Sequence, residues 1–424
     1  MQGRGHRLLS RKGAADAGVL YAAHLARYAS PLLLYPALSR RLGVEGLGLY
    51  VAAVALALIV SVVVDYGVSI SGPRDIARAD RPQGLVVGQV LAMRAALIAP
   101  AGLAGLAVAG LTPGLQHQGG VVVMAIALGA AQGMSVLWYF QGVRDPAPAA
   151  VLEVGTVLAS TVVILILPEF GVTAVLAIQA LGGWAAVILG AGLMLRRQRP
   201  SPPSAAAVWR GLVEGAPLMA SRAVIVAYTG AAVLVVGGLA GPAQAALYGV
   251  ADRVVSASAS LMRPLAGVIA PRIAGLLVRD LATAFRTVRW SLILLPGAFL
   301  AAAILLGLAA APLVRLLFGQ PFAEAANVLR LLALSLPLIA VSQVLGLQLM
   351  TPLRMDGRFA LVVGVGCVAT LGSAVLFTPP LGAMGMALAR VMGEAVVVVV
   401  CLACLRMHWR ALWPLARGRD VSTI

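Results

Sequence analysis

Long apolar stretches recur from one end of the chain to the other, and short polar breaks separate them. An α-helix rises about 1.5 Å per residue, so roughly 20 apolar residues cross the ~30 Å hydrocarbon core of a bilayer. The pattern predicts about twelve spanning helices, near residues 14–37, 47–70, 85–110, 119–141, 147–167, 172–194, 215–239, 245–268, 290–314, 327–350, 359–379 and 383–404. We therefore expect an all-α integral membrane protein.

The first apolar run, from Asp16 to Ala37, is longer than the core of a signal peptide and is followed by no A-x-A cleavage pattern. We expect it to be retained as a helix. No polar segment is long enough to form a separate soluble domain.

Composition agrees with a membrane location: 61% of the residues are apolar, 11% are charged, and the mean hydropathy is +0.97. Soluble domains carry about 25% charged residues. The net charge of +17 comes from cations scattered over many short loops, whereas nucleic-acid binding needs them clustered on one polar face. We expect no nucleic-acid partner, but rather membrane lipids and an anionic substrate.

Loop cations predict the orientation, because cytoplasmic loops carry an excess of Lys and Arg. With the N-terminus inside, the cytoplasmic segments hold 22 Lys and Arg, and the external loops with their edges hold 4. Both chain ends are therefore predicted in the cytoplasm.

The longest break contains charged residues and three prolines, which favours a cytoplasmic linker. It predicts an N-terminal six-helix half over residues 1–195, a linker over 196–214 and a C-terminal six-helix half over 215–424. At an offset of 198, the pairs 49–50 and 73–74 of the first half fall on 247–248 and 271–272, and with a drift of about a dozen residues Arg144 falls on Arg354. An even number of helices per half makes such a repeat parallel, and a central cavity between the halves is then the expected substrate path.

Several segments together resemble one family of transporters. They are residues 42–50 (LGVEGLGLY), 65–67 (DYG) with 74–77 (RDIA), 138–142 (WYFQG), 318–323 (FGQPFA) and 382–387 (GAMGMA). On these the chain resembles the polysaccharide flippases, the lipid-carrier O-antigen and exopolysaccharide exporters grouped with multidrug-and-toxin extruders and the lipid II flippase. Val143 departs from the acidic residue usual at that place, which puts any ion pair there in doubt. We expect residues 42–50 to form an external loop, and Trp138 and Tyr139 to lie in an interfacial aromatic belt.

The resemblance implies a transporter in the bacterial inner membrane that moves an undecaprenyl-pyrophosphate-linked oligosaccharide to the periplasmic leaflet by alternating access. It implies no cofactor, and it leaves open a coupling ion and contacts with the polymerase and glycosyltransferases of the same pathway. A cation extruder of the same fold is the first alternative, and a membrane glycan polymerase is the second. An acidic cavity would favour the extruder. A polymerase would need an acid–base set and a substantial aqueous loop, and the sequence lacks both.

Charged side chains inside spans cost at least ~2.5 to 3.5 kcal/mol unless they meet water or a partner. The residues selected on this basis as candidates for the substrate cavity are Arg27, Asp65, Arg94, Arg222, Asp252 and Arg253. Arginine suits a pyrophosphate because its planar fork makes bidentate bonds to phosphate oxygens.

A structural role is equally open for Arg27 and Arg222, in which they pair with Asp65, Asp252 or Glu153 and pin helices together. For Arg94 the alternative to the cavity is that its side chain extends toward the cytoplasmic headgroups. Arg390 and Glu394 lie at i,i+4 spacing, which predicts a self-contained pair on one helix.

The cysteines Cys367, Cys401 and Cys404 all fall in apolar runs, where neither a disulfide framework nor a metal site is expected. We predict no metal and interpret Cys401 and Cys404 as small apolar side chains on one helix face.

Overall fold

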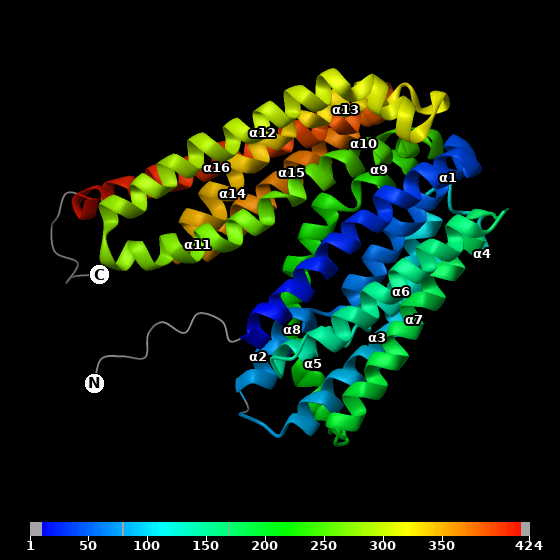
Figure 1. Cartoon of the computed structure of the whole chain (residues 1–424), viewed down its shortest axis with the longest axis horizontal. Helices are drawn as coiled ribbons and strands as arrows, with labels where there is room; N and C mark the ends of the chain where they lie inside the picture. Colours follow the sequence, from blue (N-terminus) through cyan, green and yellow to red (C-terminus); the bar gives the residue numbers. More distant parts are fainter. Residues whose placement is uncertain (1–10, 79, 169, 417–424) are drawn as a thin grey trace. The chain divides into compact units, whose positions relative to one another are not determined.

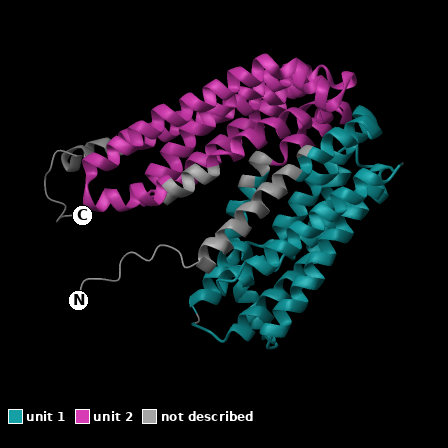
Figure 2. Ribbon diagram, viewed as in Figure 1, with its two compact units in different colours: residues 1–226 teal, residues 227–424 magenta. Residues whose placement is uncertain are grey.

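The computed structural model describes residues 11–78, 80–168 and 170–416, without the side chains of residues 11–29, 32, 225, 227–229, 263–268, 356 and 408–416. Within these ranges the chain is helical and contains no strand (Figure 1). It divides into two compact units, Met1–Val226 and Ala227–Ile424, drawn in teal and magenta in Figure 2. The division lies inside α8, the helix that follows the predicted linker.

Unit 1 contains α1 (Arg11–Asp65), α2 (Val68–Arg78), α3 (Gln83–Gly110), α4 (Gly119–Gly133), α5 (Leu137–Gly142), α6 (Ala147–Ile166), α7 (Val172–Arg197) and most of α8 (Ala205–Thr229). Its helix α1 packs against α3, α4 and α6. The closest approach is at α4, where a Cβ on Gly129 would stand 2.3 Å from the carbonyl oxygen of Ala57. Gly133, one turn further, meets Val64 at 2.6 Å in the same way. Small residues at this spacing let membrane helices pack closely.

Unit 2 contains α9 (Ala232–Ala240), α10 (Pro242–Ser260), α11 (Met262–Arg279), α12 (Leu281–Phe318), the short η1 (Gln320–Phe322), α13 (Ala325–Ala333), α14 (Ser335–Gln343), the π-helical η2 (Val344–Met350), α15 (Asp356–Leu381) and α16 (Ala383–Ala416). Helices α15 and α16 pack along each other, and α12 packs on α13 and α14. Asp280 begins α12 by accepting a hydrogen bond from the Thr283 amide at 3.0 Å, and hydrogen bonding from Thr283 lowers the pKa of the Asp280 carboxyl.

The structure confirms the all-helical membrane fold. Among the described residues, nine helices are long and apolar enough to cross a bilayer. The expected first, seventh and eighth spans correspond to the start of α1, to α8 with α9, and to α10 with α11. Each of the expected spans therefore has a helical counterpart.

Backbone conformation supports the internal repeat. Gly43 and Gly241, which are related by the 198 offset, both have positive φ angles, of 67° and 89°. Arg144 and Arg354 also match, with φ of 58° and 56°. Side chains other than glycine seldom adopt this region, so its recurrence at corresponding places indicates that the two halves share one backbone plan.

Two sequence-based expectations are corrected. Residues 42–50 do not form an open loop: they are helical, with a sharp kink at Gly43 inside α1. Within the predicted linker, 196–214, only 198–204 is non-helical, since prolines confine the break and the Ala-rich segment after it is helical. Trp138 and Tyr139 are each only 2% exposed, so they do not form an interfacial belt; Trp138 packs on α2 beside Gly72, which has no side chain to exclude it.

Candidate functional site

Two helix interruptions lie next to each other inside unit 1. Helix α1 ends at Asp65 and α2 begins at Val68, with positive φ at Tyr66 (47°) and Gly67 (80°) between them. Helix α4 ends at Gly133, and α5 begins at Leu137 after three intervening residues. Interrupted helices leave backbone groups unpaired, which lipid cannot satisfy, and membrane proteins tolerate them where they line a polar site.

At the first interruption, the Asp65 side chain accepts hydrogen bonds from the start of α2. Its Oδ1 accepts a hydrogen bond from the backbone amide of Ser69 at 3.2 Å, and its Oδ2 accepts from the Ser69 hydroxyl at 2.8 Å. The carboxylate therefore holds the first turn of α2 in place while facing the neighbouring helices.

Arg94 of α3 joins the two interruptions. Its Nη2 donates to Asp65 Oδ1 at 2.6 Å, and its Nη1 donates to the carbonyl oxygen of Ser135, between α4 and α5, at 2.6 Å. The hydroxyl of Ser135 bonds in turn to the carboxylate of Glu153 on α6. Arg94 lies about 17 Å along α3 from its start, which is well inside the spanning region.

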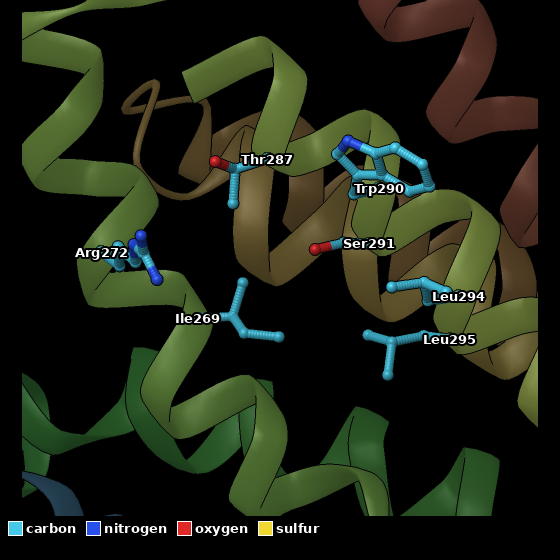
Figure 3. A pocket seen from close by; sticks show the side chains of 7 residues that line it. All are labelled: Ile269, Arg272, Thr287, Trp290, Ser291, Leu294 and Leu295. Carbon is cyan, nitrogen blue, oxygen red and sulfur yellow. The ribbon is translucent and has the colours of Figure 1, made fainter. Parts of the chain in front are cut away.

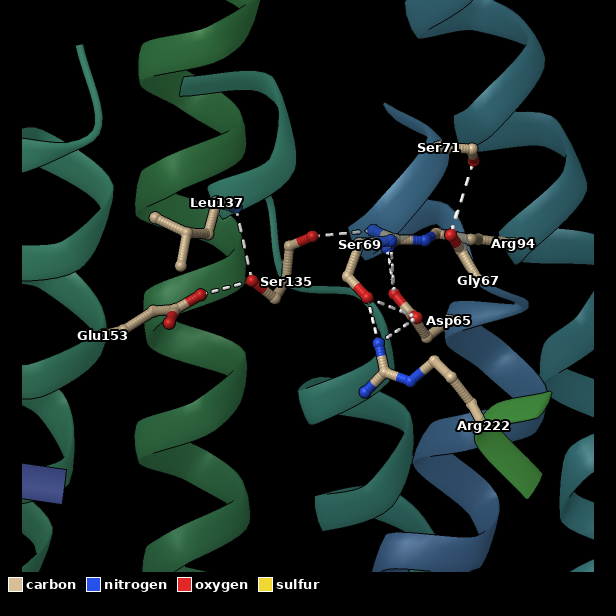
Figure 4. A network of polar contacts seen from close by, with 9 residues as sticks. All are labelled: Asp65, Gly67, Ser69, Ser71, Arg94, Ser135, Leu137, Glu153 and Arg222. Atoms are coloured by element: carbon tan, nitrogen blue, oxygen red, sulfur yellow. Dashed lines mark hydrogen bonds and ion pairs between the residues drawn. The ribbon is translucent and has the colours of Figure 1, made fainter. Parts of the chain in front are cut away.

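Arg222 reaches the same carboxylate from α8. Its Nη1 donates to Asp65 Oδ2 at 2.9 Å and also contacts the Ser69 hydroxyl (Figure 4). We call Asp65, Ser69, Arg94 and Arg222 the Asp65 cluster. Two guanidinium groups share one carboxylate in this cluster.

Burial differs sharply across the cluster. The side chain of Arg94 is 2% exposed, that of Asp65 is 10% exposed, and that of Arg222 is 35% exposed. The contacts of Arg222 within the described structure run through one guanidinium nitrogen, Nη1. A second edge of this fork is therefore available to an anion, and the three charged groups together carry one positive charge.

The six residues selected from the sequence are distributed over both units. Asp65, Arg94 and Arg222 come together, which includes the helix-pinning contact with Asp65 considered for Arg222. The alternative that Arg94 extends to the headgroups is wrong, because it is buried against Asp65 and Ser135. Arg27 lies on α1, but its side chain is outside the described part of the structure.

Asp252 and Arg253 lie on α10 in unit 2, where Asp252 accepts a hydrogen bond from Ser256 at 3.4 Å. The predicted pair on one helix is confirmed: Arg390 Nε stands 3.3 Å from Glu394 Oε1, and both side chains are largely buried.

Sequence reasoning missed the serines of the site. Ser69 stands four residues after Asp65, a spacing that places both on one side of a helical turn and that could have been noticed. Ser135 contributes a backbone carbonyl only because the helix is interrupted between α4 and α5. The residue pattern of this apolar run does not indicate such a break.

A cavity of about 250 Å³ adjoins the cluster in unit 1 and is lined by residues of α2, α3 and α8, including Tyr66 and Met93, neighbours of Asp65 and Arg94. Its charged lining consists of Arg74, Asp75, Arg78, Asp80, Arg81 and Glu214. Equal numbers of acids and bases make this lining close to neutral, whereas Asp65, Arg94 and Arg222 taken together carry one positive charge.

Comparisons with known proteins match this architecture. The family model described as polysaccharide biosynthesis protein matches residues 14–277. A candidate O-antigen transporter from Escherichia coli (strain K12) is 23% identical over 355 residues, which is 81% of this chain and 85% of the relative.

Two solved structures are similar over nearly the whole chain. An inward-facing multidrug resistance MATE family transporter of the MOP superfamily has a TM-score of 0.69 at 18% identity, covering 91% of this chain and 96% of that one. The lipid II flippase MurJ in an inward closed conformation has a TM-score of 0.68 at 11% identity, covering 93% of this chain and 87% of that one. At these identities the likeness shows a shared fold.

Proposed function

Because this chain belongs to the polysaccharide biosynthesis protein family, we propose that it carries an undecaprenyl-pyrophosphate-linked oligosaccharide from the cytoplasmic to the periplasmic leaflet of the bacterial inner membrane. Its fold and relatives make it a multi-pass membrane transporter rather than an enzyme.

The observation that carries the proposal is the positive charge of the Asp65 cluster inside the spanning helices. Arg94 is buried and fixed by Asp65 and Ser135, so it serves to hold the site. Arg222 is partly exposed and engaged through one nitrogen, so it is the group that can meet a ligand. A pyrophosphate carries the opposite charge and presents oxygens at a spacing that a guanidinium fork matches.

We infer a mechanism in which Arg222 exchanges partners. In the resting state its Nη1 binds Asp65, and when the lipid-linked pyrophosphate enters, Arg222 turns its fork to the phosphate oxygens. Arg94 remains paired with Asp65 in this step, so the Asp65 carboxylate keeps a counter-charge in the apolar interior. The sugars follow the headgroup while the polyprenyl tail stays in lipid, and rocking of the two halves exposes the site to the other side. Arg27 would contribute in the same way.

Export of polymer in cells that lack the chromosomal gene tests the proposal. Wild type should restore export, Arg222→Lys should restore part of it because lysine keeps the charge but not the fork, and Arg222→Glu should restore none. The amount of each variant in the membrane must be measured alongside. Arg390→Ala combined with Glu394→Ala is the control, since this pair lies on α16 of unit 2 and neither residue belongs to the Asp65 cluster, and it should leave export largely intact.

The same cells discriminate against a cation extruder. Arg222→Glu places a second carboxylate beside Asp65 and would favour cationic dyes. Polymer export by well-expressed Arg222→Glu, or dye efflux that rises above its wild-type level in that variant, would contradict the lipid-pyrophosphate proposal.

A further inference from the structure

A second cavity, of about 210 Å³, lies in unit 2 between α11 and α12. Figure 3 shows Arg272 on the α11 side, facing Thr287, Trp290 and Ser291 of α12, with Ile269, Leu294 and Leu295 along the lower wall. One end of this cavity is therefore polar and cationic, and the rest is apolar. We call it the Arg272 cavity.

The charge pattern of α12 places the Arg272 cavity at the level of the lipid headgroups. Arg286 and Arg289 are exposed at the start of this helix, and residues 290–314 contain no charged side chain. Trp290 stands at this boundary with 55% of its surface exposed, and Leu294 one turn further is 62% exposed. Tryptophan at the edge of an apolar span is typical of the membrane interface.

The Arg272 cavity is the repeat counterpart of the cavity in unit 1. At the offset of 198, Ser71, Arg74, Gln89 and Met93 of the unit 1 cavity correspond to Ile269, Arg272, Thr287 and Ser291 of the Arg272 cavity. The fold thus forms the same hollow twice, each time beside the arginine of a Pro-Arg pair.

The two hollows differ in what covers and neutralises them. In unit 1, α8 lies over the hollow and supplies Glu214 to a lining that also contains Asp75 and Asp80. The lining of the Arg272 cavity contains no acid, and within the described residues Arg272 has neither an ion pair nor a hydrogen bond. The nearby Asp280 is occupied in starting α12.

We propose that the Arg272 cavity binds an anionic phospholipid of the leaflet in which Arg286 and Arg289 lie. The lipid phosphate accepts hydrogen bonds from the Arg272 guanidinium, with Arg286 and Arg289 adding positive charge around it. An acyl chain lies on Ile269, Leu294 and Leu295, and Trp290 lies between headgroup and chain. Basic pockets between membrane helices on the cytoplasmic side bind anionic headgroups in this way.

This proposal is independent of the transported substrate. The cavity has an apolar wall that a free phosphate ion would not use, and its charge favours an anionic over a zwitterionic headgroup. A phospholipid such as phosphatidylglycerol supplies both features and is present throughout the leaflet.

Lipid binding to the purified full-length protein in neutral detergent tests the proposal, by native mass spectrometry and by thermal unfolding. Wild type should retain phosphatidylglycerol and gain in Tm when it is added, and phosphatidylcholine should give neither effect. Arg272→Gln should weaken phosphatidylglycerol binding about tenfold, the equivalent of one charge-assisted hydrogen bond. Arg279→Gln is the matched control: it removes the same charge from the same helix about two turns away and should bind as wild type does.

A second measurement covers the case in which Arg272→Gln does not fold. Phosphatidylglycerol with brominated chains should quench a part of the tryptophan fluorescence that is missing in Trp290→Phe. Quenching of that part to the same extent by brominated phosphatidylcholine would overturn the proposal.

Three other results would also overturn it. They are equal phosphatidylglycerol binding by wild type and Arg272→Gln, stabilisation by inorganic phosphate without lipid, and preferential binding of a polyprenyl phosphate. The last would assign the cavity to the substrate path, and would leave the proposed transport function standing while removing the phospholipid site.

Discussion

Asp65 binds two guanidinium groups with one carboxylate, and these two contacts differ in kind. Arg94 is buried with Asp65 and also satisfies the Ser135 carbonyl, so losing it would leave a buried charge and an unpaired backbone group. Arg222 is exposed to about a third of its surface, where water and ions screen the interaction. One partner of Asp65 is therefore structural, and the other is exchangeable.

We predict that Arg94→Met destabilises the protein far more than Arg222→Met. Removing one member of a buried ion pair costs about 3–5 kcal/mol, while a part-exposed pair contributes roughly 1 kcal/mol or less. Thermal unfolding of the detergent-solubilised variants measures both. Equal losses of Tm would show that Arg222 is as structural as Arg94 and would remove the basis for partner exchange.

A double-mutant cycle gives an independent check. Asp65→Asn leaves two arginines without a counter-charge, so adding Arg222→Gln to it should recover part of the lost stability. In an otherwise wild-type background, Arg222→Gln should give no such gain. Additive effects of the two substitutions would mean that the pair does not interact in the folded protein.

The sequence identified the charged members of the Asp65 cluster, but of their contacts it offered only the pairing of Arg222 with Asp65, as one of several. A charge in an apolar run is visible without a structure, which is why Asp65, Arg94 and Arg222 could be selected. Asp65 and Arg222 are 157 residues apart, and only the packing of α8 on the interrupted α1 and α2 brings them together. For the same reason extension toward the headgroups stayed open for Arg94: the sequence indicates its position along α3, but not that the Asp65 carboxylate faces it.

At the scale of elements, the linker is a docked segment rather than a free tether. The Ser201 amide donates to the Gly84 carbonyl at 2.9 Å, and Gln89 donates to the Ala207 carbonyl at 2.8 Å. A Cβ on Gly88 would stand 1.9 Å from the carbonyl oxygen of Ser201. The start of α3 thus holds the linker through a position that only glycine fits.

We predict that Gly88→Ala displaces the linker from α3 and so speeds cleavage by trypsin between Arg197 and Gln198, where α7 ends. Cleavage of the solubilised variant at this segment should be at least severalfold faster than in wild type. Gly110→Ala, in the same helix, is the control because a Cβ there has nothing within 4 Å. Unchanged cleavage in Gly88→Ala would show that the linker adapts without leaving α3.

The boundaries of the elements show how far pattern reading extends. The apolar runs predicted the long helices α3, α6, α7 and α15 to within a few residues, because hydrophobic length alone sets them. The hydropathy pattern did not reveal the kink at Gly43 or the helical start of α8, because a single backbone angle and a short amphipathic turn change the hydropathy very little.

At the scale of the whole molecule, the same six-helix plan occurs twice with different charges. Two pairs of left-handed residues, Gly43 with Gly241 and Arg144 with Arg354, and the two cavities fall at corresponding positions. The Asp65 cluster does not: position 263, which corresponds to Asp65, is an arginine. The two halves thus share features of one backbone plan but differ in the ionisable residues that form their sites.

The distribution of loop cations predicts that the N-terminus, the linker and the C-terminus all lie in the cytoplasm, since the opposite orientation would place 22 cations outside and 4 inside. Fusions of alkaline phosphatase and of a fluorescent protein after Ser204 report the two sides. We expect fluorescence and no phosphatase activity. The reverse pattern would invert the topology and with it the direction assigned to transport.

If the protein moves a lipid-linked saccharide between leaflets, the leaflet in which that lipid is found depends on the protein. In spheroplasts depleted of the protein, the lipid-linked saccharide should accumulate and stay inaccessible to an impermeant lectin or oxidant added outside. Re-expression of wild type should make it accessible, and re-expression of an equally abundant Arg222→Glu variant should not. External accessibility that is the same with and without the protein would contradict the account.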